Sequence, residues 1–255
     1  MFLVIGSADY EHRIKPGAPP RSTACNIACN LVQHENGVAL YTHVCPSGVN
    51  AKLLVSLYEK HRFDPCGLIL DYTISAPMND AGFGRAVFDK SLLRTLMQRA
   101  HVVIADANLT EVQLATVFDV AHLSDKPLAL GMSGAYQALL AGSIKPAITP
   151  DIVFMSETEA NGYLKQTWAS IKPEEICRTF GSRTVCVTQD KNFGILTSDG
   201  HRHSFSAAAL SQFTGNADVV TSGILHFHYT DKGDWMQRAA LLRRVGQYIR
   251  SVPLG

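Results

Sequence analysis

The sequence lacks several features that would point directly to a function. Its formal net charge is only +1, so it has no basic surface of the kind that binds nucleic acid or an anionic membrane. No apolar run approaches the ~20 residues that a membrane-spanning helix needs. The apolar run at residues 1–6 is too short for a signal peptide and has no basic flank. We therefore expect a cytoplasmic protein that binds neither nucleic acid nor membrane.

The common catalytic motifs are also missing. The chain contains neither the G-x-x-x-x-G-K-[ST] pattern of a P-loop nor the H-E-x-x-H pattern of a zinc protease. The G-x-G at residues 82–84 has no third glycine, which argues against a dinucleotide-binding turn. Two His-x-His pairs, at residues 201–203 and 226–228, have no carboxylate or cysteine in ligand spacing. We interpret them as core or surface histidines and predict no metal ligands among the side chains.

Cysteine is sparse, and no C-x-x-C pair occurs among the six cysteines, so the zinc and thioredoxin patterns are excluded. Cys25 and Cys29 are four residues apart and could share one face of a helix. In an apolar chain of this size we expect reduced thiols in the core. That expectation agrees with a cytoplasmic location.

What the sequence does contain is a regular alternation of short apolar runs and helical patterns. With 46% hydrophobic residues in 255, the chain can bury a substantial core. Strands alternating with helices predict a mostly parallel sheet covered on both faces. The fold class expected is α/β, in one domain over 1–255. The expected strands are 2–5, 38–44, 101–105, 127–130, 152–155, 184–188 and 193–197, and the expected helices are 24–32, 51–61, 110–122, 135–140, 157–164, 218–229 and 235–251.

One turn late in the chain stands out, where Thr214, Gly215, Asn216 and Ala217 lead to Asp218 at the start of an apolar run. A turn of this kind aims the free N–H groups of a helix N-terminus at one point, which suits an anion. A carboxylate beside such a site could serve as the base in phosphoryl transfer to a hydroxyl. Asp218 could equally be an ordinary helix N-cap. From these residues alone both interpretations stay open.

The order of these elements, together with the Thr-Gly-Asn-Ala-Asp turn, resembles the PfkB (ribokinase-like) carbohydrate kinases, and most closely their pseudouridine and nucleoside kinases. The likeness extends from about Phe2 to Gly223. It implies a three-layer α/β/α sandwich with a small β lid, here over about 67–88. It also implies ATP and Mg²⁺ as cofactors, a sugar or nucleoside as the small-molecule substrate, and a homodimer that could form through the lid.

The resemblance assigns roles to individual residues. In the family signature D-T-T-G-A-G-D, Asp218 takes the place of the catalytic base, and Gly215, Asn216 and Ala217 supply the anion hole. The segments after the central strands imply further positions. Thr188, Thr214, Gly194 and Glu159 would lie near the nucleotide and its magnesium, and Glu11 and Asn26 would contact the sugar.

The chain also departs from the family pattern. The glycine pair before the first helix reads Arg21-Ser22, and the sugar-binding aspartate aligns with Glu11. Ser156, Gln212 and Ala217 replace an asparagine, an aspartate and a glycine, and a G-D-D segment aligns with residues 45–47. These changes fall on groups that orient sugar and nucleotide, while the base is kept. Two outcomes follow, an ATP-dependent sugar or nucleoside kinase, or a catalytically impaired relative that acts as a ligand-binding or regulatory module.

Overall fold

The structure is a computed structural model that describes residues 1–8, 23–33, 36–46, 49–73, 83, 85–141, 149–189, 192–206 and 216–230. By its internal contacts the chain divides into two compact units, residues 1–127 with 133–148 and residues 128–132 with 149–254. The described elements of the first unit are β1 (Phe2–Ile5), α1 (Thr23–Val32), β2 (Val38–Val44), α2 (Val49–His61), η1 (Pro65–Gly67), β3 (Leu68–Leu70), α4 (Lys90–Arg99), β4 (Val102–Ala105), α5 (Glu111–Leu123) and α6 (Gly134–Ala141).

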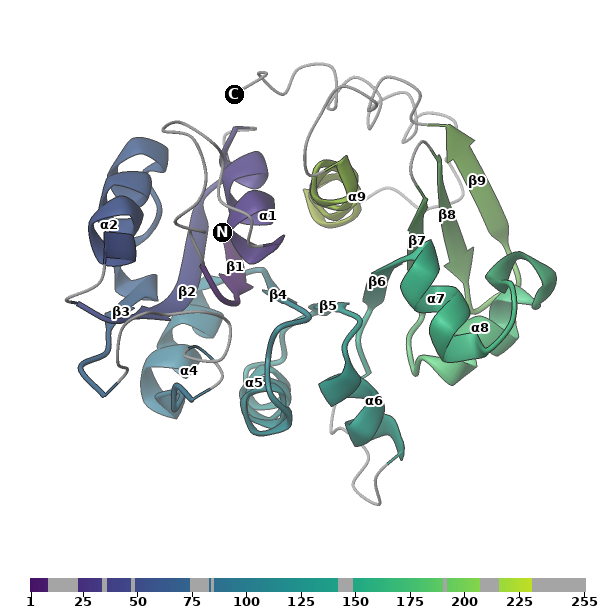
Figure 1. Ribbon diagram of the computed structural model, residues 1–255, viewed down its shortest axis with the longest axis horizontal. Helices are drawn as coiled ribbons and strands as arrows, with labels where there is room; N and C mark the ends of the chain where they lie inside the picture. Colours follow the sequence, from purple (N-terminus) through teal and green to yellow (C-terminus); the bar gives the residue numbers. More distant parts are fainter. Residues whose placement is uncertain are drawn as a thin grey trace. The chain divides into compact units, whose positions relative to one another are not determined.

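The first unit is built on four parallel strands in the order β3-β2-β1-β4. Phe2 of β1 lies opposite Val38 of β2 and Val102 of β4. Every residue of β1, β2 and β4 is buried, which means that both faces of these strands are covered. Helices α1 and α2 lie over one face and α4 and α5 over the other (Figure 1). This is the arrangement that uniformly apolar parallel strands require.

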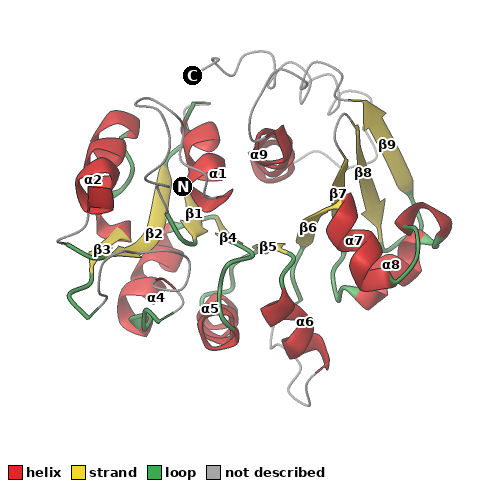
Figure 2. Cartoon of the chain, in the orientation of Figure 1, coloured by secondary structure: helices red, strands yellow, loops and turns green. Residues whose placement is uncertain are grey.

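The second unit is likewise built on parallel strands, and two antiparallel strands follow at its edge. Its elements are β5 (Leu128–Gly131), β6 (Ile152–Ser156), α7 (Glu157–Leu164), η2 (Trp168–Ser170), α8 (Pro173–Thr179), β7 (Thr184–Gln189), β8 (Asn192–Thr197), β9 (Arg202–Ser206) and α9 (Asn216–Thr230). Strands β5, β6 and β7 are parallel, whereas β8 and β9 follow as antiparallel neighbours. Helix α9 lies over one face of this sheet and helices α7 and α8 over the other (Figure 2).

These observations confirm the α/β class and the mostly parallel sheet with helices on both faces. Each of the strands and helices that the sequence analysis placed within the described residues is present, with ends that differ by a few residues. The helix expected over 235–251 lies outside the described residues. The single domain over 1–255 stays a prediction. So does the lid over about 67–88, because residues 74–82 and 84 lie outside the described residues. At the start of that segment, Leu68–Leu70 is β3, a parallel neighbour of β2.

Two further expectations can be compared with the structure. None of the helices in the described ranges combines the length and the apolarity that a transmembrane segment requires. All six cysteines are described and all are free thiols, four of them buried. The expectation that most of the thiols lie in the core is therefore confirmed, and their reduced state stays a prediction.

Candidate functional site

In the first unit, polar residues gather where β1 and β4 end. Gly6 follows β1, and a Cβ on it would lie 2.6 Å from Cβ of Ala24 and 2.6 Å from Cβ of Asp106. The glycine therefore lets α1 and the end of β4 approach β1 closely. Ser7 and Asp106 are both buried at this end. The Oδ1 atom of Asp106 accepts a hydrogen bond of 2.7 Å from the N–H of Ala107.

Of the sugar-contacting residues that the resemblance implies, only Asn26 is described. It lies on α1 and is partly exposed. Glu11 lies outside the described residues. Neither Ser7 nor Asp106 was singled out in the sequence analysis as a candidate site residue. A signal was present for both residues, since each comes almost directly after a four-residue apolar strand whose carboxyl end faces the same edge of a parallel sheet.

In the second unit, Ser156 and Glu159 form the N-terminus of α7. The side chain of Ser156 caps the helix, and Glu159 Oε2 accepts hydrogen bonds from the Ser156 N–H (2.7 Å) and hydroxyl (2.8 Å). The N–H of Glu159 donates back to Ser156 Oγ at 3.2 Å. This capping box holds the carboxylate of Glu159 at the carboxyl end of β6. Burial, and then the negative charge of Glu159, raise the pKa of Tyr163 one turn along the helix.

Thr188 lies beside that carboxylate-bearing helix end. It pairs in register with Ser156 across β6 and β7, and its hydroxyl donates to the carbonyl of Met155 at 3.2 Å. The side chain is partly exposed. The structure thus brings together two of the residues predicted near the nucleotide, Thr188 and Glu159, at the carboxyl ends of neighbouring parallel strands. Ligands of α/β proteins bind outside such ends.

The direction of α9 follows from its last turn. Burial, followed by the negative charge of Asp151, raises the pKa of Tyr229, so the end of α9 lies near the start of β6. From Asn216 to Tyr229 the helix is about 20 Å long, and β6 spans about 17 Å. Because α9 also contacts β7, its N-terminus lies toward the carboxyl ends of β6 and β7. That is the end which carries Glu159 and Thr188.

Asp218 occupies the first turn of α9 and is partly exposed, while the helix behind it is deeply buried. Its carbonyl accepts a hydrogen bond of 2.5 Å from Ser222 Oγ, so the residue is firmly part of the helix. Asn216 and Ala217 are the first two residues of α9, and their N–H groups have no intrahelical acceptor. Thr214 and Gly215 lie outside the described residues. The N-terminus of α9 is therefore a place where negative charge is stabilised.

Gly194 has a packing role that the resemblance did not suggest. A Cβ on this residue would lie 2.6 Å from the ring of Trp168. The Trp168 side chain is buried, its indole N–H donates to Glu157 Oε1 at 3.1 Å, and the guanidinium of Arg202 lies 5.2 Å from the ring centre. The absence of a side chain at Gly194 is thus required by a neighbouring tryptophan. Its predicted place near the nucleotide stays a prediction.

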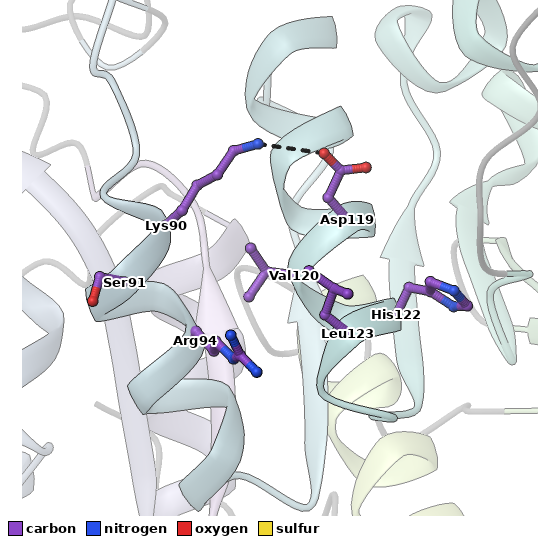
Figure 3. Close-up of a pocket in the computed structure, with 7 residues that line it drawn as sticks. All are labelled: Lys90, Ser91, Arg94, Asp119, Val120, His122 and Leu123. Atoms are coloured by element: carbon purple, nitrogen blue, oxygen red, sulfur yellow. Dashed lines mark hydrogen bonds and ion pairs between the residues drawn. The ribbon is translucent and has the colours of Figure 1, made fainter.

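A surface groove of about 450 Å³ lies elsewhere, between α4 and α5 of the first unit (Figure 3). Lys90 and Asp119 form an exposed ion pair of 3.4 Å across it. None of the residues lining it is a predicted site residue; they are Lys90, Ser91, Arg94, Asp119, Val120, His122 and Leu123. Within the described residues there is also no group of three or more His, Cys, Asp or Glu that could hold a metal ion.

Comparison with known proteins finds similarity in fold but none in sequence. No model of a known protein family matches the chain, and no curated protein matches it. Solved structures do. A PfkB-family carbohydrate kinase from Listeria grayi is 12% identical with a TM-score of 0.68, covering 96% of this chain and 92% of that one. The fold is that of the PfkB-family carbohydrate kinases.

Two other structures with the PfkB fold are similar over nearly their whole length. A carbohydrate kinase from Agrobacterium tumefaciens is 19% identical, with a TM-score of 0.62 over 97% of this chain and 89% of that one. A fructokinase from Vibrio cholerae O395, solved with fructose, ADP and calcium, is 13% identical, with a TM-score of 0.66 over 97% and 89%. At such identities the comparison establishes the fold and leaves the activity to be argued from the site.

Proposed function

We propose that this protein is an ATP-dependent kinase of the PfkB type that transfers a phosphoryl group to a hydroxyl of a sugar or nucleoside, pseudouridine included. The observation that carries the proposal is the position of Asp218. It places a carboxylate in the first turn of a buried helix, at the carboxyl ends of parallel strands, in a fold shared with sugar kinases. A helix N-terminus attracts phosphate, and a carboxylate beside it can remove a proton from the attacking hydroxyl.

In this mechanism Asp218 accepts the proton of the substrate hydroxyl as the oxygen attacks phosphorus. The N–H groups of Asn216 and Ala217 at the start of α9, with Gly215 before them, stabilise the negative charge on the transferring group. Such fixed donors act strongly because they need no reorganisation during the reaction. The positive end of the α9 dipole adds to the same effect.

ATP would lie with its phosphates toward α9 and its remaining part along β7 and β8, near Thr188, Thr214 and Gly194. The free N–H groups at the start of α9 are donors that fit a polyphosphate. Magnesium binds mainly to substrate phosphates and water, with only one or two protein carboxylates, which suits the donor set here. Glu159, held by its capping box, is the residue that would orient magnesium-bound water.

The sugar would contact Asn26 of α1 and Glu11. The V. cholerae fructokinase is solved with fructose, so a ketohexose belongs in any set of acceptors to be tested. The nucleoside and pseudouridine branch stays in that set because the resemblance noted in the sequence implies such acceptors. Glu11, one methylene longer than the family aspartate, is a residue that could alter the choice of acceptor.

Two further expectations belong to the proposal. Six free thiols suit the reducing conditions of the cytoplasm, where we place the protein. A homodimer would form through the lid, within which Tyr72 (84% exposed) and Val87 (85% exposed) present apolar surface. Phe83, in contrast, is fully buried and therefore belongs to the core.

The test is release of ADP from ATP and Mg²⁺ over a panel of pentoses, hexoses and nucleosides that includes fructose and pseudouridine. We expect sustained turnover with at least one class of acceptor. Calorimetry with ATP–Mg²⁺ separates the alternatives. Nucleotide binding without turnover on any acceptor would support the impaired, ligand-binding relative, and absence of both binding and turnover would overturn the kinase assignment.

A further inference from the structure

Two cysteine thiols lie together on one face of α1. Cys25 and Cys29 are one helical turn apart, a spacing that makes their side chains neighbours, and the two thiols are hydrogen-bonded to each other. Cys25 is fully buried, whereas Cys29 is partly exposed. The pair thus has an inner thiol shielded from solvent and an outer thiol that a small reagent can reach.

The last turn of α2 brings positive charge to the outer thiol. His61 is hydrogen-bonded to the Cys29 thiol, and Lys60 is close enough for its charge to act on it. The His61 ring is stacked on Phe63, with ring centres 5.7 Å apart and planes 20° apart, which fixes its orientation. A hydrogen bond from a histidine and the charge of a nearby lysine both stabilise a thiolate.

The surroundings act oppositely on the two thiols. The hydrogen bond from Cys25 lowers the pKa of Cys29 most strongly; with His61 and Lys60 it outweighs burial, so that this pKa falls to about 6. The same hydrogen bond, with burial, raises the pKa of Cys25 well above its usual value. The other groups on α2 and just after it that act on this region are Tyr58 and Asp64. At neutral pH the outer sulfur is then an anion and the inner one a proton donor.

We propose that Cys29 is a peroxide-reactive thiolate and that Cys25 is its resolving thiol. In the first step the Cys29 sulfur attacks hydrogen peroxide, an S–O bond forms as the O–O bond breaks, and the leaving hydroxide takes a proton to become water. The product is a sulfenic acid. In the second step the Cys25 sulfur attacks the sulfenic sulfur, an S–S bond forms, and the hydroxyl leaves with the Cys25 proton as water. Peroxide is the oxidant and the two thiols are oxidised together.

The second step requires α1 to adjust. Side chains four residues apart on a helix have Cβ atoms about 5–6 Å apart, whereas a disulfide needs about 3.5–4.5 Å. Local distortion of one helical turn closes that gap. The resulting bond should therefore be reduced readily by a dithiol, which makes the oxidation reversible.

Cys66 provides an internal comparison. It is exposed, and its backbone N–H donates to the carboxylate of Asp64 at 3.0 Å, a carboxylate that also pairs with Arg99. Accessibility alone would make Cys66 the first cysteine to react. The charges around the α1 pair predict that Cys29 reacts first.

The experiment treats the native protein with hydrogen peroxide at pH 7, blocks remaining thiols with N-ethylmaleimide and maps the products by peptide mass spectrometry. We expect a disulfide joining Cys25 and Cys29 while Cys66 is still reduced. Cys25→Ser should leave a sulfenic acid on Cys29 that dimedone traps, and Cys29→Ser should leave Cys25 unoxidised. Oxidation of Cys66 before Cys29, or no disulfide in the native protein, would overturn the proposal.

A second measurement on the unaltered chain does not depend on how the variants fold. The rate of Cys29 alkylation by iodoacetamide should be half-maximal near pH 6, and at pH 6 it should exceed that of a thiol of ordinary pKa about tenfold. His61→Gln should slow it severalfold, whereas His122→Gln, an exposed histidine on α5 of the same unit, should not. A rate that rises only above pH 8 would contradict the role given to His61 and Lys60.

Discussion

At the scale of single residues, Gly194 illustrates how a family position can carry more than one role. The resemblance places it near the nucleotide, and the structure adds the ring of Trp168, which would lie 2.6 Å from any Cβ at this position. The packing against Trp168 requires the absence of a side chain, and the place near the nucleotide stays a prediction. The packing role has a consequence for stability that is independent of any ligand.

Gly194→Ala should therefore lower the free energy of unfolding by about 1–3 kcal/mol, because the buried Trp168 must shift. Gly162→Ala is the matched control in the same unit, since a Cβ there meets nothing within 4 Å and the position is an exposed one in α7. It should be neutral or raise stability by up to about 1 kcal/mol. Urea unfolding of both variants checks the pair, and equal losses would show that Trp168 is not the cause.

Individual residues also show how much of the structure could be predicted from the sequence. The Thr-Gly-Asn-Ala-Asp turn predicted a helix N-terminus at Asp218, which the structure has as the first turn of α9. The spacing of Cys25 and Cys29 predicted a shared helix face. The contact of Trp168 with Gly194 and that of His61 with Cys29 join segments that are far apart in the chain. No local sequence pattern could therefore predict these contacts. The charge environment of Cys29 was therefore out of reach until the fold was known.

At the scale of elements, one carboxylate at the N-terminus of α7, that of Glu159, caps the helix and is also the group that we propose to act near magnesium. Glu159 Oε2 accepts two hydrogen bonds from Ser156, which completes a capping box. A glutamine can make the same reciprocal cap. The charge of Glu159 is thus separable from its structural role by a single substitution.

We expect the free energy of unfolding of Glu159→Gln to stay within about 0.5 kcal/mol of that of the native protein, since the capping box persists. Under the proposed function this substitution should still weaken magnesium-dependent ATP turnover. Ser156→Ala, in contrast, should lower the free energy of unfolding by about 1 kcal/mol, because it removes the cap. Chemical denaturation and ADP release measured on both variants distinguish these outcomes. A Glu159→Gln protein with full activity would remove Glu159 from the magnesium site.

At the scale of the whole molecule, the mostly parallel sheet with helices on both faces could be predicted from the alternation of apolar runs and helical patterns, because parallel strands buried on both faces have few arrangements. Histidines whose pKa is lowered by burial or partial burial, in contrast, could not be recognised from their sequence neighbours. Burial lowers the pKa of His43 in the first unit. It also lowers the pKa of His226 and, to about 4, that of His228 in α9. These groups are neutral in the folded protein at neutral pH.

Stability should consequently fall as the pH drops from 6.5 toward 5. In this interval the unfolded chain binds protons on histidines that the folded chain leaves neutral, so acid favours unfolding. Each such histidine contributes at most about 1.4 kcal/mol per pH unit. Carboxylates such as Asp199, whose pKa is lowered to about 2 by hydrogen bonds from Thr197 and His201, lose their contribution only at lower pH.

Guanidinium unfolding at pH 7 and pH 5 measures this dependence, and His228→Gln should reduce it. His122→Gln, at an exposed position on α5, should leave it unchanged. A stability that is constant across this interval would mean that the three histidines are not held neutral by burial.

The central claim is that Asp218 at the start of α9 is the base for phosphoryl transfer. The most direct measurement is transfer of labelled γ-phosphate from ATP to the accepted sugar or nucleoside by the native protein and by Asp218→Asn, with Asp119→Asn, an exposed aspartate paired with Lys90, as control. We predict a rate about 10²–10⁴ lower for Asp218→Asn, ATP binding retained by calorimetry, and an unchanged rate for Asp119→Asn. Equal rates for Asp218→Asn and the native protein would contradict the account.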